Sequence, residues 1–306
     1  MNIEPPSQNV FVIAKKDFRD AARSKLIWAL TALFVLVEVL AGVLEVEFAK
    51  LQDGAAPAAD EIARSIAGHV LLFVALGAII VAFKSIAGER ESGSIKFLLS
   101  LPNSRVDVVL GKVLGRWMVL VVPFLAGMSV GTLVGWIRIG ETDIVAFLLA
   151  VLAVALFAFA FVSIIVAFST AFESTMRVIA ASLLVFVMIY IGWNFVPIVA
   201  WLSVEWALAG EFTAISKLAQ DPIPVWVFYL DALSPVSAFD NTINIITGRD
   251  PSVRLPPFIG PIMQAFIGFE LAESRWATNW LGPISLAFWS VVPLVVAIVR
   301  FELDDL

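Results

Sequence analysis

Long hydrophobic runs alternate with short polar stretches along this chain. Six of the runs reach roughly 20 residues or more, the length that a helix needs to cross the hydrocarbon core of a bilayer. The pattern therefore predicts an all-α fold, a polytopic membrane protein with six transmembrane helices in a single transmembrane domain, residues 1–306. The expected spans are residues 26–44, 66–83, 106–137, 144–168, 178–202 and 280–300.

The segment that precedes the first run, residues 10–25, is amphipathic and basic. Its apolar residues recur at helical spacing, while basic residues face elsewhere. The apolar stripe consists of Phe11, Ala14, Phe18, Ala21 and Ala22, and the basic residues are Lys15, Lys16, Arg19 and Arg23. We expect an N-terminal interfacial helix that lies in the headgroup plane, with a solvated basic tail as the alternative.

Lysine and arginine give the orientation of the spans. The short loops on the side of the N-terminus hold most of these residues, whereas the short loops on the other side hold only Lys50, Arg64 and Arg138. Because basic loops stay in the cytosol, we expect both termini to be cytoplasmic in a plasma membrane protein. Residues 84–112 then face the cytosol.

Residues 84–112 form a polar island between the second and third runs. Within this island, residues 94–101 have the pattern of a short amphipathic helix, with Ile95, Leu98 and Leu99 on one face. A helix that lies across the cytoplasmic ends of two spans is suited to being pushed by a cytosolic partner.

A helix start signal follows this amphipathic segment. Ser104 is followed three residues later by Asp107, the spacing of a capping box. We therefore expect the helix of the third span to begin at Ser104, before its hydrophobic run, so that its first turns extend out of the bilayer.

The segment 203–279 is too long to be a plain connector. It contains two half-apolar pieces, Ile223–Leu233 and Phe258–Leu271, which are too short to span a bilayer. We expect interfacial or re-entrant helices that cap the outer face, and a partner outside the cytoplasm can bind here. An independently folded outer domain is the alternative.

Three glycines of the third run, Gly127, Gly131 and Gly135, are spaced four residues apart. Small residues at this spacing let two membrane helices approach closely. The pattern predicts a packing face, either within one subunit or at a dimer interface.

Two polar residues lie inside predicted spans. Glu38 is a carboxylate within the first span, where it needs a partner, a pore or a dimer seam because an isolated charge is costly in hydrocarbon. Asn194 in the fifth span favours a helix–helix hydrogen bond. Both are candidates for a translocation path, and for Glu38 a purely structural role is equally consistent with the sequence. His69, the only histidine, is interpreted as structural.

Composition excludes several classes of function. The chain has no cysteine and one histidine, so we expect no disulfide and no metal site. The net charge of −6 argues against nucleic acid as a partner. No GxxxxGK[ST] motif for ATP, no HExxH and no GxSxG occurs. We therefore expect no catalytic residue, no cofactor and no enzymatic activity in this chain.

Three strings of the cytoplasmic island and its surroundings resemble a known family. They are GERESGS at 88–94, LLSLPNSR at 98–105 and LGK at 110–112. With the six spans and the amphipathic N-terminal helix, they resemble the permease subunits of type-two ATP-binding-cassette exporters. The subgroup that the chain looks most like includes permeases of nitrous-oxide-reductase maturation and of sodium or drug efflux.

The resemblance implies a permease that has no ATPase of its own and works as a homodimer or heterodimer with two cytosolic ATPase subunits. The loop between the second and third spans would be the coupling helix, seated in a groove of the ATPase. By position, Glu89, Arg90 and Glu91 would make the polar contacts to the ATPase, and Ile95, Leu98 and Leu99 the apolar ones. The length of 203–279 departs from the short outer turn of the family.

The sequence thus predicts a permease subunit that moves an unidentified substrate across the plasma membrane with ATP hydrolysed on a partner chain. Two alternatives remain at this point. The first is a membrane subunit that assembles or anchors other proteins without transporting, and the second is a lipid-modifying membrane enzyme. The second would need converging titratable groups at one membrane depth, and Glu38 alone does not supply them.

Overall fold

The computed structural model describes residues 9–53, 59–99, 104–209, 224–248 and 279–303. All the elements in these ranges are helical, which confirms the all-α prediction for the described part of the chain. Six helical stretches are long and apolar enough to cross a membrane, as the hydrophobic pattern predicts. They are Ile27–Leu51, Gly68–Glu91, Arg105–Ile139, Ile144–Ala171, Thr175–Ala207 and Leu281–Glu302.

The described residues form two compact units, 1–183 with 287–306 and 184–286. The first unit holds α1 (Asn9–Ala22), α2 (Lys25–Asp53), α3 (Ala59–Ala82), α4 (Ala87–Glu91), α5 (Ile95–Leu99), α6 (Arg105–Ile139), α7 (Ile144–Ala171) and most of α8 (Thr175–Val187). The second unit holds α9 (Val196–Ala209), α11 (Val225–Asp231) and α12 (Pro235–Thr247). The last helix, α14 (Leu281–Glu302), begins in the second unit and ends in the first.

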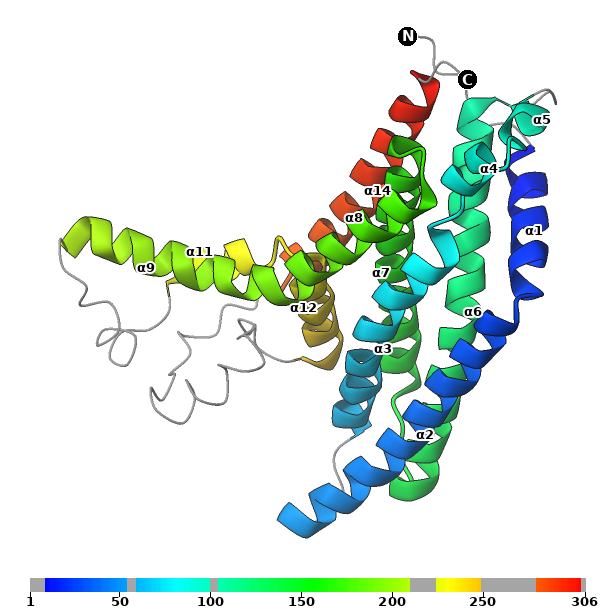
Figure 1. Cartoon of the computed structure of the whole chain (residues 1–306). Helices are drawn as coiled ribbons and strands as arrows, with labels where there is room; N and C mark the ends of the chain where they lie inside the picture. The colour runs from blue at the N-terminus through cyan, green and yellow to red at the C-terminus, as the bar shows by residue number, and fades with distance from the viewer. Residues whose placement is uncertain (1–8, 54–58, 100–103, 210–223, 249–278, 304–306) are drawn as a thin grey trace. The chain divides into compact units, whose positions relative to one another are not determined.

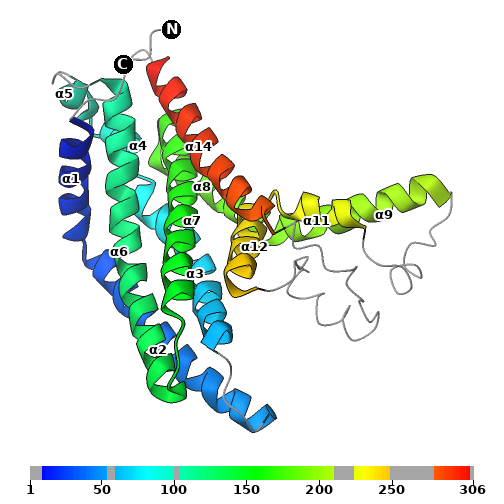
Figure 2. The same cartoon turned by 180° about the vertical axis from the view of Figure 1, so that it is seen from behind.

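The central helix of the first unit is α6, with 35 residues. It packs against α1, α2, α3 and α7, and Figures 1 and 2 show α1 and α2 following one another along it. Its start is the predicted capping box: the Asp107 N–H donates to the Ser104 hydroxyl at 3.0 Å, and the Ser104 N–H donates to the Asp107 carboxylate at 3.1 Å. This prediction is confirmed, and the capping box fixes the start of α6 at Arg105.

The N-terminal helix α1 lies along the first part of α6. Its buried face is Val10, Ile13, Ala14, Asp17 and Ala21. Only two members of the predicted stripe belong to this face, and Phe11 is exposed. That the stripe faces the membrane interface stays a prediction. The face toward α6 is a different one, because it is set by packing against that helix, and it includes an aspartate.

Two glycines of α6 make the close contact with α1 possible. A Cβ atom at Gly111 would lie 2.6 Å from Cβ of Ile13, and one at Gly115 would lie 2.9 Å from Cβ of Asp17. Such distances are too short for real side chains, so only glycine allows the two backbones to come this near.

The predicted glycine stripe further along α6 faces α2 within the same chain. A Cβ atom at Gly127 would collide with the ring of Phe34, and one at Gly131 would lie 3.2 Å from the Glu38 carboxylate. Gly135 is buried in the same helix. Phe34 packs edge-on against Phe124 with ring centroids 4.7 Å apart, which fills the space beside the glycines.

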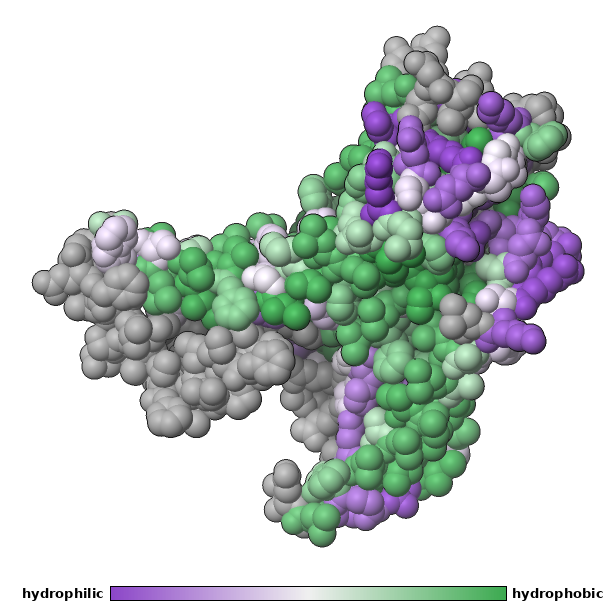
Figure 3. Space-filling view, in the orientation of Figure 1, coloured by the Kyte–Doolittle hydropathy of each residue, from purple (hydrophilic) through white to green (hydrophobic). Residues whose placement is uncertain are grey.

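Hydropathy divides the surface of the first unit into bands (Figure 3). Hydrophilic residues gather at the end that carries α1, α4 and α5, and hydrophobic residues cover the middle. This arrangement is typical of a helical bundle whose middle faces lipid.

The second unit contains an interruption of the helical backbone. Residues Met188–Gly192 form a π-helical turn and Trp193–Phe195 a 3-10 turn before α9 begins. The predicted piece Ile223–Leu233 contains α11, whereas Phe258–Leu271 lies outside the described residues.

Helix α12 was not among the predicted elements. The side chain of Ser234 caps its start with Pro235 at the first position, and Gly248 ends it at a φ of 67°. This Ser-Pro start and glycine stop are sequence signals that could have found it.

We predict that Gly111→Leu separates α1 from α6 and lowers stability by ~2 kcal/mol, because overpacking a close helix contact forces the backbones apart. Thermal unfolding of the purified protein in detergent measures the effect. Gly68→Leu is the control, because a Cβ atom at Gly68 would meet nothing within 4 Å. Equal midpoints for the two variants would contradict the close contact.

Candidate functional site

The candidate site is the segment between α3 and α6, residues 83–99, which we call the coupling segment. Gly93, with a φ of 74°, separates α4 from α5 in a conformation that favours glycine. Ser169 of α7 holds the start of α4: its hydroxyl accepts from the N–H groups of Ile86 and Ala87 at 3.0 and 2.9 Å and donates to the Phe83 carbonyl at 3.3 Å. The segment is therefore anchored to α7.

A cluster of charges joins the coupling segment to α1 and α6. The Lys112 ammonium lies 2.6 Å from the Glu89 carboxylate and 3.7 Å from that of Asp17. Arg116, one turn later on α6, pairs with Asp17 at 2.6 Å and donates to the Val81 carbonyl at 2.9 Å. Three helices that are distant in sequence thus share one network of ion pairs.

This charge cluster is largely removed from solvent. The side chain of Lys112 is 4% exposed and that of Asp17 is 10% exposed. A buried ammonium is tolerable only beside carboxylates that neutralise it, so removing one partner leaves an uncompensated buried charge. The network therefore resists separation of α4 from α1 and α6.

A second anchor joins the coupling segment to α8. The Glu91 carboxylate accepts from the Thr175 N–H at 2.7 Å and from its hydroxyl at 3.1 and 3.0 Å. Thr175 is the first residue of α8, where N–H groups lack helical partners and negative charge is favourable. Glu91 thus caps a helix from another part of the chain.

A third anchor involves the end of α14. Arg105, the first residue of α6, donates to the carbonyls of Phe301 and Glu302 at 2.7 and 3.2 Å. These carbonyls belong to the last turn of α14, where a cation is favourable. The buried ring of Phe301 also lies 5.8 Å from the guanidinium carbons of both Arg90 and Arg105. The coupling segment and the end of α14 are therefore packed together.

The other end of the segment, α5, is largely exposed. Phe97 is 79% exposed and Lys96 is exposed beside it, whereas Ile95 is 3% exposed. The side chains of Leu98 and Leu99 lie outside the described part. An aromatic side chain that is this exposed at the polar end of a bundle is suited to contact another protein.

Four of the residues predicted to contact the ATPase are engaged within their own chain. Glu89, Arg90 and Glu91 have partners within the chain, and Ile95 is buried in it. Their contact with a partner chain stays a prediction, which the structure of one chain does not test.

The sequence did not predict the residues of α1, α6, α7 and α8 that anchor the coupling segment to the bundle. They are Asp17, Lys112, Arg116, Ser169 and Thr175. Two signals could have found the charged ones. Lys112 and Arg116 are four apart near the start of a hydrophobic helix, and Asp17 interrupts a helical apolar face. A charge in such a position requires an opposite charge nearby.

The two candidates for a translocation path lie elsewhere. Glu38 is buried in the first unit. Asn194 lies in the 3-10 turn of the second unit, and its amide donates to the Tyr190 carbonyl at 2.6 Å. This bond stays within its own helix rather than joining two helices, because the irregular turns interrupt the regular hydrogen-bond ladder there.

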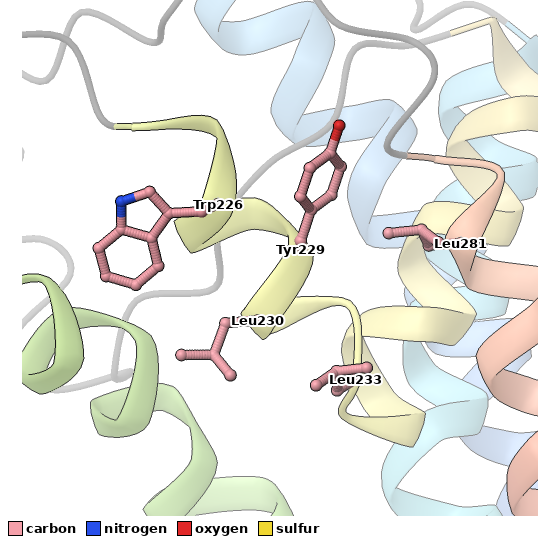
Figure 4. Close-up of a pocket in the computed structure, with 5 residues that line it drawn as sticks. All are labelled: Trp226, Tyr229, Leu230, Leu233 and Leu281. Carbon is pink, nitrogen blue, oxygen red and sulfur yellow. The ribbon is translucent and has the colours of Figure 1, made fainter.

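The second unit also contains an apolar pocket of about 650 Å³ (Figure 4). Trp226, Tyr229, Leu230 and Leu233 come from α11 and the turn after it, and Leu281 from the start of α14. Among the described residues of its lining, the polar side-chain groups are the Tyr229 hydroxyl and the Trp226 indole N–H.

The profile of the ABC-2 family transporter proteins matches residues 11–306, nearly the whole chain. The chain belongs to the ABC-2 transporter family. In this family the chain is a multi-pass permease subunit that lacks an ATPase, in agreement with the absence of a nucleotide-binding motif.

Two curated relatives are similar to part of this ABC-2 protein. Both are named probable ABC transporter permease protein NosY. The one from Pseudomonas aeruginosa is 30% identical over 126 residues, and the one from Stutzerimonas stutzeri is 29% identical over 125 residues. The matches cover 39% and 40% of this chain and only 43% and 44% of the relatives' own length.

We predict that Lys112→Ala destabilises the protein by ~3 kcal/mol, because it leaves Asp17 and Glu89 without their shared cation. Thermal unfolding in detergent measures the loss. Lys96→Ala, which removes an exposed lysine of the same segment, is the control and should be neutral. The double variant Lys112→Ala with Glu89→Gln should recover part of the loss; strictly additive effects would contradict a shared ion pair.

Proposed function

We propose that this ABC-2 protein is the membrane-spanning subunit of a transporter that moves its substrate across the plasma membrane with energy from ATP hydrolysed by a separate cytosolic subunit. One observation carries the proposal. The coupling segment exposes an aromatic side chain at its tip and is fastened at its base to α1, α6, α7, α8 and α14. A segment of this kind can be displaced by a bound ATPase at its exposed end and can transmit the displacement to the helices that hold its base.

In the proposed mechanism, two ATPase subunits close on ATP and displace α5. Because α4 is joined to Lys112, Thr175 and Phe301, the displacement reaches α6, α8 and α14 together. The helices then rock as rigid bodies between an inward and an outward state. Buried ion pairs suit this role since they break less readily than exposed ones.

The residues predicted to contact the ATPase divide into two roles in this proposal. Leu98 and Leu99 keep their predicted contact with the ATPase groove, and Phe97, which was not among the predicted residues, joins them because it is exposed. Ile95 seats α5 on its own chain, since it is buried. Glu89, Arg90 and Glu91 position the segment through their internal partners, and the exposed parts of these side chains border the ATPase.

The proposed topology places both termini and the coupling segment in the cytosol, as the distribution of lysine and arginine indicates. In it α1 lies at the inner membrane interface with its basic residues toward the headgroups. The transporter is a dimer of permease subunits, identical or not, and residues 203–279 line its outer face. A lipid or amphipathic substrate suits the apolar spans.

Affinity purification from native membranes tests the proposal. The protein, solubilised in mild detergent, should elute with a second subunit and with ATP hydrolysis activity. A protein that elutes alone and without this activity would contradict the transporter and favour an anchoring role for residues 203–279.

We predict that Phe97→Ala weakens capture of the ATPase subunit about 30-fold, the effect of removing one aromatic anchor worth ~2 kcal/mol from an interface. Binding of the co-purified ATPase subunit to the separately purified permease measures the change. Phe48→Ala is the control, because Phe48 is also exposed but lies near the far end of α2. Unchanged affinity for Phe97→Ala would exclude the tip of α5 from the interface.

A further inference from the structure

A buried carboxylate between α2, α3 and α6 takes no part in the coupling segment. The side chain of Glu38 is 0% exposed, and neither of its oxygens has a hydrogen-bond partner in the described structure. It is tightly enclosed: a Cβ atom at Gly131 would lie 3.2 Å from its Oε2 and 3.3 Å from Cδ1 of Ile66. An ionised, unpartnered carboxylate at such a place is costly, which calls for an explanation.

The imidazole of His69 stands between Glu38 and a second carboxylate. Its Nδ1 lies 3.7 Å from Oε1 of Glu38, and its Nε2 lies 3.8 Å from Oε1 of Glu45. The side chains of His69 and Glu45 are 32% and 33% exposed, and Ser65 donates a hydrogen bond to Glu45. One ring nitrogen thus faces a buried acid and the other a partly exposed acid.

The charge of this cluster depends on how many protons His69 and the two carboxylates hold. A neutral imidazole has one N–H and one bare nitrogen. With both carboxylates ionised, the bare nitrogen would face a negative oxygen, and the cluster would hold two negative charges. One additional proton, on the ring or on Glu38, removes the repulsion and halves the charge. The cluster therefore has a strong electrostatic reason to hold a proton.

No described cation of the surrounding helices replaces this proton. Glu38 and Glu45 come from α2 and His69 from α3, while α6 presents Gly131 to Glu38. The nearby Arg138 of α6 is paired with Glu47. Glu45 stands two residues before Glu47, where α2 becomes polar, and its side chain is as exposed as that of His69, so it is the carboxylate of the cluster that water reaches.

We propose that Glu38, His69 and Glu45 form a proton-binding site within the membrane-spanning part of the protein. Small side-chain rotations close the separations of 3.7 and 3.8 Å on either side of the ring to hydrogen-bond length. Glu45 then delivers a proton taken up from water to Nε2 of His69, while the proton on Nδ1 passes to Glu38. The ring is neutral before and after the transfer, and the carboxyl group of Glu38 ends as the acid.

A proton is the ligand that fits this enclosure. Ca²⁺ and Mg²⁺ need six or more oxygen ligands, whereas Glu38 is fully buried beside Gly131. The described residues also contain no group of three or more side chains placed to hold a metal ion. Protonation neutralises Glu38 where it meets the backbone of α6, so the proton favours close packing of α2 on α6. The site thereby couples proton binding to the contact between two spans.

The single histidine of the chain makes a direct test possible. The full-length protein, carrying a tag without histidine and labelled with ¹⁵N-histidine, gives one set of ring signals in lipid bilayers. Infrared spectra of the same sample detect protonated carboxyl groups. At neutral pH we expect either both ring nitrogens to carry hydrogen or a carboxylic acid band that Glu38→Gln removes.

Variants locate the proton and its route. Glu45→Gln should slow exchange of the site's proton with solvent deuterium at least tenfold, and Glu47→Gln, on the same helix, should leave it unchanged. A neutral ring in the unmodified protein, together with the absence of any acid band that Glu38→Gln removes, would overturn the proton site. An unchanged exchange rate in Glu45→Gln would overturn the route.

Discussion

The ammonium group of Lys112 is the constraint on which the rest of the coupling site depends. It is buried between carboxylates from α1 and from the coupling segment. Because a buried charge cannot lose its counter-charges without a large cost in free energy, this ion-pair network resists separation of α1, α4 and α6. A purely hydrophobic contact would hold the same helices together, but because it is non-directional it would let them shift along one another.

Helix α6 connects the two polar regions of the first unit. Near its start it offers cations to Asp17 and Glu89, and its glycines admit α1 at close range. Further along it presents Gly131 to Glu38, beside the proposed proton site. One continuous helix thus contacts the part that a cytosolic subunit would move and the part that would bind a proton, so a shift of α6 as a whole would affect both.

Much of this fold could be predicted from hydrophobic periodicity, and the remainder depends on contacts between distant residues. Six spans and the start of α6 followed from the length of the apolar runs and from the pair Ser104 and Asp107. The partner of each charged residue could not be predicted, because nothing local in the sequence relates Asp17 to Arg116 or Glu91 to Thr175. The face by which α1 packs against α6 depends in the same way on contacts with another helix, and α12 was not predicted although Ser234 and Gly248 mark its ends.

In the proposed mechanism, the coupling segment moves as one body with α1 and α6. Because the chain has no cysteine, spin labels can be attached at Lys96→Cys on α5 and Arg19→Cys on α1 without altering other thiols. The distance between the labels should stay the same when ATP binds to the assembled transporter, and its distribution should broaden when Lys112→Ala is added. A change of several ångströms on ATP binding with Lys112 intact would contradict the account.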